Sequence, residues 1–234
     1  MDTTGTFEMA EALSEYKLLT AISKHYTLEQ WVNFARKSPT ALPYAAISLG
    51  TSKENFEITK SIVKEVPDIN IICLDIANGY CEPFLAAVQQ LRDFFPEKII
   101  IAGNVVTPDQ ATRVLEAGAD IIKLGIGGGS VCTTSRQTGV GLPQLSCILE
   151  CESAIRSLKG ISMSDGGITN AGDLCKAFGA GAGFVMMGGM LAGHTESGGE
   201  IVKRDGQQFK RFYGMSSGMA MEKYYGGIAY YRSS

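Results

Sequence analysis

Short apolar runs alternate with amphipathic stretches along most of the chain. Near-continuous apolar character is typical of strands that a parallel sheet buries on both faces. This pattern predicts strands at residues 18–22, 45–49, 69–76, 98–102, 121–126, 160–164 and 184–187. Apolar residues at helical spacing predict helices at residues 28–35, 56–66, 83–95, 108–117, 142–158 and 171–178. Thr27, Thr107 and Asn170 mark helix starts, as capping residues do.

The alternation of strands and helices predicts an α/β fold in one domain, residues 1–234. Seven strands with six intervening helices indicate a (β/α)8 TIM barrel that lacks one strand, with a doubly wound sheet as the competing topology. Unusual polar residues and glycines follow nearly every strand, including Lys24, Gly50, Asp75, Asn104 and Asp165. A barrel gathers all such strand ends into one ring, whereas an open sheet gathers only those at its switch point. Their placement therefore favours the incomplete barrel.

The last part of the chain, at about residues 200–234, predicts a β-hairpin followed by a flap. Residues 200–212 have strand-like composition and surround Asp205-Gly206, a dipeptide that favours tight hairpin turns. The tail beyond them is rich in Gly, Ser and Tyr, which suits a segment that covers a site.

Composition excludes several classes of protein. The net charge of -3 gives no electrostatic reason to expect a nucleic acid or an anionic membrane as partner. No apolar run approaches the roughly 20 residues that span a bilayer, and no signal segment opens the chain. Six cysteines without a C-x-x-C pair, and only two histidines, argue against zinc. We expect a cytoplasmic protein with reduced thiols.

The glycine-rich stretch at residues 125–134 is the strongest chemical signal. It follows an apolar run and carries Cys132. Glycines let such a loop bend sharply and expose its backbone to a ligand, and a thiol there can act as a nucleophile. The alternative is a flexible turn beside a half-buried cysteine.

Two further strand ends suggest a nucleotide site. Gly188 and Gly189 would let a phosphate approach backbone amides, although a plain tight turn explains them equally simply. Asp165, before Gly166 and Gly167, suits the hydroxyls of a ribose, or else caps the next helix. Together the two loops describe a nucleoside monophosphate site better than either does alone.

Lys24 and Asp75 place opposite charges at strand ends, where burial is costly unless the charges are paired or used in function. A simple ion pair between them is the alternative. Thr134, two residues after Cys132, could relay a proton, or could only bond the backbone. We assign no catalytic role to His25 or His194.

Gly-x-Gly-Ser-Val-Cys-Thr-Thr, followed by Thr138-Gly139-Val140-Gly141, resembles the active-site loop of the IMP dehydrogenase/GMP reductase family. Within the family, the phrases beginning at Met1, Lys24, Asp75, Gly103 and Gly214 look like those of GMP reductases, and the CBS insertion typical of the dehydrogenases is absent. The resemblance runs along the whole chain. It implies NADPH-dependent reductive deamination of GMP to IMP, with release of ammonia, and a homotetramer.

The resemblance also implies a role for each matching residue. Cys132 would attack C2 of the purine, Thr134 would relay a proton, and Lys24 and Asp75 would lie near the reacting centre. The substrate would contact Asp165, Gly166, Gly167, Gly188, Gly189, Gly214, Met215, Ser216 and Arg232. NADPH would contact Lys24, Asp75, Ile76, Ala77, Ile126, Gly127, Met215, Tyr231 and Arg232. Carbonyls of Gly127, Gly129 and Cys132 would bind potassium.

The chain departs from the family pattern at three positions. Gly128 stands where the family usually has proline, Ser135 where it has arginine, and Ser23 where it has histidine.

The ends of the chain also differ from the pattern. Met1-Asp2-Thr3 matches the end of the family's first barrel strand, so we expect that strand to be missing. The chain stops just before the flap glutamate that completes the proton relay with Thr134. Two alternatives therefore stay open: an IMP dehydrogenase, or a non-catalytic nucleotide-binding fragment.

Overall fold

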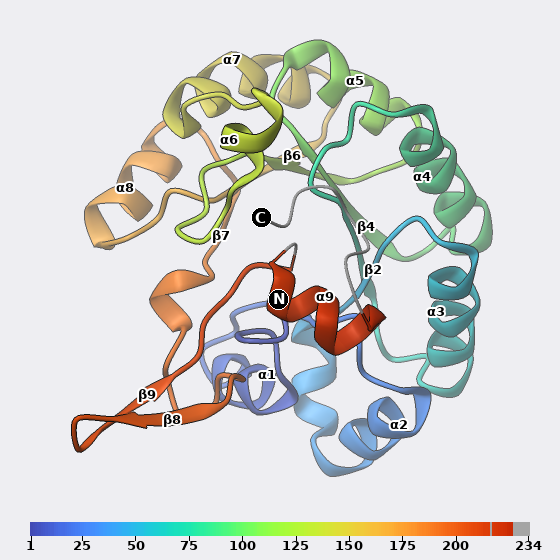
Figure 1. Ribbon diagram of the computed structural model, residues 1–234. Coiled ribbons are helices and arrows are strands. Elements are labelled where there is room, and N and C mark those ends of the chain that lie inside the picture. Colours follow the sequence, from blue (N-terminus) through green and yellow to red (C-terminus); the bar gives the residue numbers. More distant parts are fainter. Residues whose placement is uncertain (216, 227–234) are drawn as a thin grey trace.

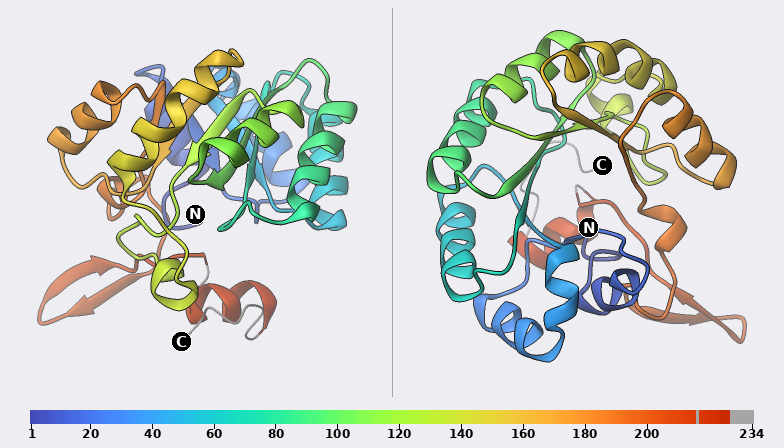
Figure 2. Two further views of the ribbon diagram at one scale, coloured as in Figure 1. Left: turned by 90° about the horizontal axis from the view of Figure 1, so that it is seen from above. Right: turned by 180° about the vertical axis from the view of Figure 1, so that it is seen from behind.

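The computed structural model describes residues 1–215 and 217–226. Its main feature is a seven-stranded sheet in which every neighbouring pair is parallel and the strand order follows the chain. The sheet curls into a half-barrel with helices on its outer side (Figures 1 and 2). The expectation of an incomplete (β/α)8 barrel is confirmed. The strands are β1 (Thr20–Ile22), β2 (Ala45–Leu49), β3 (Ile71–Asp75), β4 (Ile99–Val105), β5 (Ile121–Leu124), β6 (Ile161–Asp165) and β7 (Phe184–Met186).

All six predicted helices are present close to their expected bounds. They are α2 (Leu28–Lys37), α3 (Lys53–Glu65), α4 (Glu82–Phe94), α5 (Pro108–Glu116), α7 (Gln144–Ser157) and α8 (Ala171–Gly179). The capping signals at Thr27 and Asn170 act as predicted, since each side chain accepts a hydrogen bond from a backbone N–H of the first turn. Thr107 is also an N-cap residue, but its side chain makes no capping bond.

Three α-helices and two 3-10 turns lie outside the prediction. The helices are α1 (Phe7–Ser14), α6 (Thr134–Thr138) and α9 (Gly218–Tyr225), and the turns are η1 (Pro39–Tyr44) and η2 (Gly189–Leu191). Thr6 caps α1 by accepting from Met9 N at 3.0 Å, and Ser217 caps α9 in the same way. Within the described residues, no helix combines the length and apolarity needed to cross a membrane.

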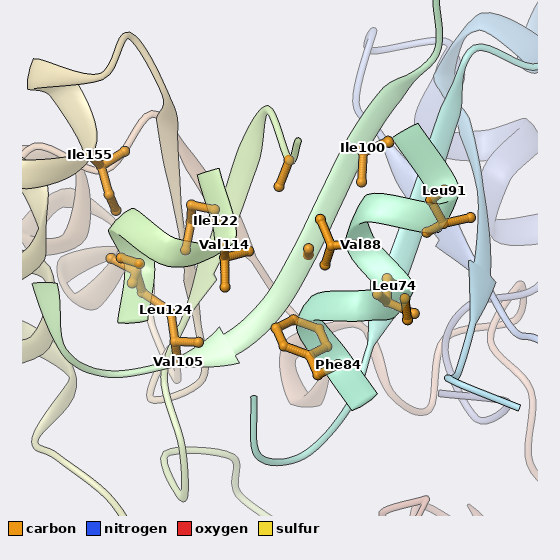
Figure 3. Close-up of a cluster of buried hydrophobic side chains, with 14 of the residues drawn as sticks. Leu74, Phe84, Val88, Leu91, Ile100, Val105, Val114, Ile122, Leu124 and Ile155 are labelled. Atoms are coloured by element: carbon orange, nitrogen blue, oxygen red, sulfur yellow. The ribbon is translucent and has the colours of Figure 1, made fainter. Parts of the chain in front are cut away.

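Alternate residues of each strand lie on the outer and the inner face of the sheet. Side chains such as Leu74, Ile100 and Ile122 point outward and pack against Phe84 and Val114 of α4 and α5 (Figure 3). The inner face carries a smaller apolar cluster of Ala46, Ile71, Cys73, Ile101, Ile121 and Met163. This alternation, with period two, brings Asp75, Lys123 and Asp165 onto the inner face as well.

The predicted hairpin is present as β8 (Ile201–Arg204) and β9 (Gln207–Lys210). Asp205 and Gly206 both have positive φ, 52° and 75°, as a type I′ turn requires. The hairpin projects away from the half-barrel, whereas α9 lies across its open end beside the N-terminus (Figure 1). Of the two, α9 is therefore the element placed to cover the inner face.

Candidate active site

A pocket of about 1150 Å³ lies inside the half-barrel. Several strands end at its wall, as the fold predicts for a barrel site. Of the residues singled out in the sequence, those that line it are Lys24, Gly50, Asp75, Ile76, Ala77, Gly129, Cys132, Thr134, Asp165, Gly188, Gly214 and Met215. Ser216, Tyr231 and Arg232 lie outside the described residues.

The loop after β5 presents Cys132 to this pocket. Gly125 has a φ of +134°, and a Cβ there would lie 2.2 Å from the carbonyl oxygen of Asp165, so the turn admits only glycine. Farther along, the N–H of Cys132 donates to the carbonyl of Gly129 at 3.0 Å. The Cys132 side chain is partly exposed, and Thr134, at the start of α6, is buried. A thiol in this position can reach a ligand.

Gly166 and Gly167 pack against that same loop. Gly167 N–H donates to the carbonyl of Gly128 at 2.8 Å, and a Cβ on Gly166 would lie 3.0 Å from the carbonyl carbon of Gly128. Both glycines have positive φ. Of the predicted site residues that the structure describes, those that do not line the pocket are Gly166, Gly167, Ile126, Gly127 and Gly189.

The turn after β7 lies beside the cysteine loop. A Cβ on Gly189 would lie 3.0 Å from Oγ of Ser130. The carbonyl of Gly188 accepts hydrogen bonds from Leu191 and Ala192, which closes a 3-10 turn of three residues. Gly188 thus lines the same pocket as Cys132, on a turn of three residues.

The strongest electrostatic feature of the pocket is a residue that our sequence reasoning missed. Lys123 is 1% exposed, and its Nζ lies 2.7 Å from Oδ1 of Asp75 and 3.0 Å from Oδ2 of Asp165. Asn104 Nδ2 donates to the same Asp165 oxygen at 2.9 Å. Burial alone would raise the pKa of Asp75, but the Lys123 ammonium lowers it below its ordinary value. Burial opposes the charge on Lys123 too, yet Asp165 and Asp75 raise its pKa.

Lys24 is left facing the pocket without Asp75 as its ion-pair partner. The ion pair considered between those two residues forms instead between Lys123 and Asp75. Lys24 lies near Gly50, where a Cβ would stand 3.7 Å from its Nζ. The neighbouring ring of His25 stacks on Tyr224 of α9 at 3.5 Å between centroids. Burial, and then the charge of Lys24, lower the pKa of His25 to about 4, so His25 is neutral at neutral pH.

Within the described residues, no group of three or more His, Cys, Asp and Glu side chains could hold a metal ion. Backbone carbonyls are a different donor set. The carbonyl of Gly129 already accepts from Cys132 N–H, and carbonyl oxygens have a second lone pair. Ser135 is close by, because a Cβ on Gly127 would lie 2.7 Å from its Oγ. These oxygens suit a hard monovalent cation better than a transition metal.

Comparison with known proteins gives one consistent result. The family described as "IMP dehydrogenase / GMP reductase domain" matches residues 1–233. The chain is 56% identical over 234 residues to "GMP reductase 2" of Bos taurus and of Homo sapiens, and 54% identical over 235 residues to "GMP reductase" of Aliivibrio salmonicida. Each alignment covers 100% of this chain and 67 or 68% of the relative, so the chain spans about two thirds of their length.

Proposed function

The chain belongs to the IMP dehydrogenase/GMP reductase family, and we propose that it is an oxidoreductase that converts GMP to IMP with NADPH. The observation that carries this proposal is the position of Cys132. Its thiol stands on a glycine loop at a pocket of about 1150 Å³ that Lys24, Asp75 and Asp165 also line. Such a pocket has room for a nucleotide and part of a second ligand.

The substrate side is formed by the loops after β6, β7 and β9. Asp165 would accept the ribose hydroxyls, and its position in the pocket wall supports this. Gly188 and Gly189 would admit the phosphate, and Gly214 and Met215 would contact the base. Gly166 and Gly167 act here through the cysteine loop that they pack against. For Ser216 and Arg232 the family resemblance alone supports a substrate contact.

The covalent step falls to Cys132. Its thiolate would add to C2 of GMP, and the exocyclic amine would leave as ammonia after taking up protons. The product is a thioimidate between the sulfur and C2. Hydride addition at C2 and departure of the thiolate would then give IMP. Thiolate suits both steps, because it is a strong nucleophile and a good leaving group. Thr134, which lines the pocket two residues away, would pass a proton to the amine.

The cofactor side would be formed by Lys24, Asp75, Ile76 and Ala77, which all line the pocket. When bound, NADPH supplies the hydride, and the protein supplies its orientation. The half-exposed carboxylate of Asp75 fits an amide donor of the nicotinamide. Met215, which lines the pocket, would contact the cofactor as well, and the resemblance adds Ile126 and Gly127. For Tyr231 and Arg232 the resemblance is again the only support.

We further propose a potassium ion on the carbonyls of Gly127, Gly129 and Cys132. The proximity of the Ser135 hydroxyl to Gly127 supports it, because this oxygen could join the set where the family has arginine. The ion would hold the cysteine loop in shape. A homotetramer rests on the resemblance, and light scattering of the purified protein tests it. A cytoplasmic location rests on the composition and on the reduced thiols expected there.

The test follows NADPH oxidation, through the absorbance of the nicotinamide, with and without GMP. Turnover that needs GMP and is lost in Cys132→Ser supports the proposal. Cys175→Ser is the matched control, since Cys175 is exposed and lies outside the pocket. NADH formation from IMP, with no NADPH consumption, would instead identify a dehydrogenase. GMP binding without turnover would identify a non-catalytic nucleotide-binding protein.

A further inference from the structure

Lys123 occupies an unusual position for a charged residue. It lies inside strand β5, where Ile121, Ile122 and Leu124 are all buried, and is itself 1% exposed. A buried ammonium is tolerated only when its charge and hydrogen bonds are compensated. Asp75 and Asp165 supply that compensation from β3 and β6, on either side.

Gly103 makes the contact with Asp75 possible. Strand β4 lies between β3 and β5, and Gly103 pairs with both Asp75 and Lys123 in the sheet. A Cβ on Gly103 would lie 2.4 Å from Cβ of Lys123. With no side chain at this position, the lysine can cross β4 and reach the carboxylate beyond it.

Each carboxylate uses only one oxygen in this arrangement. Lys123 bonds Oδ1 of Asp75, while Lys123 and Asn104 share Oδ2 of Asp165. No residue that the structure describes donates a hydrogen bond to Asp75 Oδ2 or Asp165 Oδ1. The two side chains are 48% and 25% exposed, in residues that line the pocket. The free oxygens are therefore available as a pair of acceptors to ligands.

Removing the Lys123 ammonium would leave the carboxylates of Asp75 and Asp165 as neighbours with no cation between them. Neighbouring carboxylates then share one proton, because the second charge is strongly disfavoured. The other ionisable groups near them are Lys24, the N-terminal amine, and Cys73, whose pKa burial raises to about 12. Cys73 stays neutral, and neither amine forms an ion pair with either carboxylate within the described residues.

We propose that Lys123 is a positioning residue that couples the two halves of the pocket. It holds Asp75 and Asp165 side by side and charged, so that one accepts from the cofactor and the other from the ribose. The assignment of these two ligands rests on the proposed function. The ion pairs that Lys123 forms with the two carboxylates do not depend on it.

The first experiment needs no ligand. Aspartate carboxyls are labelled with 13C and titrated by NMR in the wild type and in Lys123→Met, with Asp75→Asn and Asp165→Asn to assign the signals. In the wild type the Asp75 carboxyl is expected to be ionised at neutral pH, because the Lys123 ammonium lowers its pKa. In Lys123→Met one of the two carboxyls is expected to titrate at least one pH unit above its wild-type value. Lys64→Met, on the exposed face of α3, is the matched control.

The second experiment measures KM for each ligand separately. Lys123→Met is expected to raise KM for GMP and for NADPH, each about tenfold, because neither carboxylate is then held in place, and tenfold corresponds to about 1.4 kcal/mol, the size of one hydrogen bond to a charged group. Asp165→Asn should affect mainly GMP, and Asp75→Asn mainly NADPH. Lys123→Arg should restore most of both, because it keeps the charge. A residue that only supported the fold would not show this division between ligands.

Lys123→Met could fail to fold, and the double variant Asp75→Asn/Lys123→Met then decides. Removal of one carboxylate relieves the repulsion, so restored folding is the expected result, and a double variant that stays unfolded would overturn the proposal. Unchanged carboxyl titration in Lys123→Met, with both KM values unchanged, would overturn it as well. Wild-type protein that never oxidises NADPH contradicts the proposed function, while the titration still decides the role of Lys123.

Discussion

Nζ of Lys223, on α9, lies 2.9 Å from Oδ2 of Asp2 at the other end of the chain. The same carboxylate oxygen accepts from the hydroxyls of Tyr213 and Tyr224. The Asp2 side chain is 8% exposed, so these bonds are shielded from water. One N-terminal carboxylate thereby fixes α9 over the pocket.

Asp2→Asn is expected to loosen α9. The amide keeps the shape of the side chain but loses the charge that strengthens hydrogen bonds from Lys223 and the two tyrosines. We expect the free energy of unfolding to fall by about 2 kcal/mol, a value typical of hydrogen bonds to a charged group. Denaturant unfolding measures it, and hydrogen exchange should show faster exchange in α9. Asp68→Asn, at an exposed turn, is the control, and an equal effect there would contradict the role of Asp2.

The same carboxylate predicts a loss of stability in acid. Burial would raise the pKa of Asp2, but hydrogen bonds from Tyr224, Lys223 and Tyr213 lower it below the ordinary value of 3.8. A carboxylate with a lowered folded-state pKa stabilises the protein above the unfolded pKa, and this contribution is lost as pH falls through the folded value. The stability difference between wild type and Asp2→Asn should be constant above pH 5 and shrink below about pH 4. A difference that does not depend on pH would contradict it.

His25 predicts a second loss of stability on acidification, in a pH range above that of Asp2. Its pKa is about 4 in the folded protein and 6.5 as a free side chain, chiefly because it is buried. The unfolded chain therefore takes up a proton first, and stability falls as pH drops from about 6.5 to about 4. Unfolding curves for wild type and His25→Gln over this range test it, since the variant should lack that slope. His194→Gln, at an exposed position, is the control.

Gly103→Ala is expected to destabilise the fold. The added Cβ would meet Cβ and the carbonyl oxygen of Lys123 at 2.4 and 2.6 Å, and strand backbone cannot move aside freely. Overpacking of this kind costs about 1–3 kcal/mol. Thermal unfolding measures the change. Gly179→Ala, where a Cβ meets nothing within 4 Å, should leave stability nearly unchanged.

Thiol labelling should separate Cys132 from the other cysteines. Cys73, Cys147 and Cys151 are buried and should stay unlabelled in folded protein. Cys81 and Cys175 are exposed and should react at rates that nucleotide leaves unchanged. GMP should protect Cys132, because it is partly exposed and lines the pocket with Thr134 and Asp165, whereas Cys73, the other cysteine in the pocket wall, is already buried. Iodoacetamide labelling followed by peptide mass spectrometry measures the labelling rate of each cysteine. A labelling rate of Cys132 that GMP does not change would contradict its place in the nucleotide site.

The strands and main helices could be predicted because their signals are local. A strand buried on both faces must be apolar along its length, and Thr27 and Asn170 bond N–H groups only three residues away. The hairpin turn depends on a dipeptide, Asp205-Gly206, and was predicted for the same reason.

The missed features depend on distant partners or on short helices. In the sequence, Lys123 only interrupts an apolar run. Its partners Asp75 and Asp165 lie 48 and 42 residues away, and only the curved sheet brings the three side chains together. Helices α6 and α9 are five and eight residues long, too short for a clear apolar period. Asp2 meets Tyr213 across 211 residues, a relationship that no local pattern records.

Each strand of the main sheet pairs only with the strand that follows or precedes it in the chain. Such pairings have modest sequence separation, and folding rates rise as separation falls. The half-barrel can therefore assemble progressively, one strand and one helix at a time, as the polypeptide is made. The contact between Asp2 and α9 is different, because it needs both ends of the described chain. Pulse-labelled hydrogen exchange during refolding should thus find the strands protected early and α9 protected last.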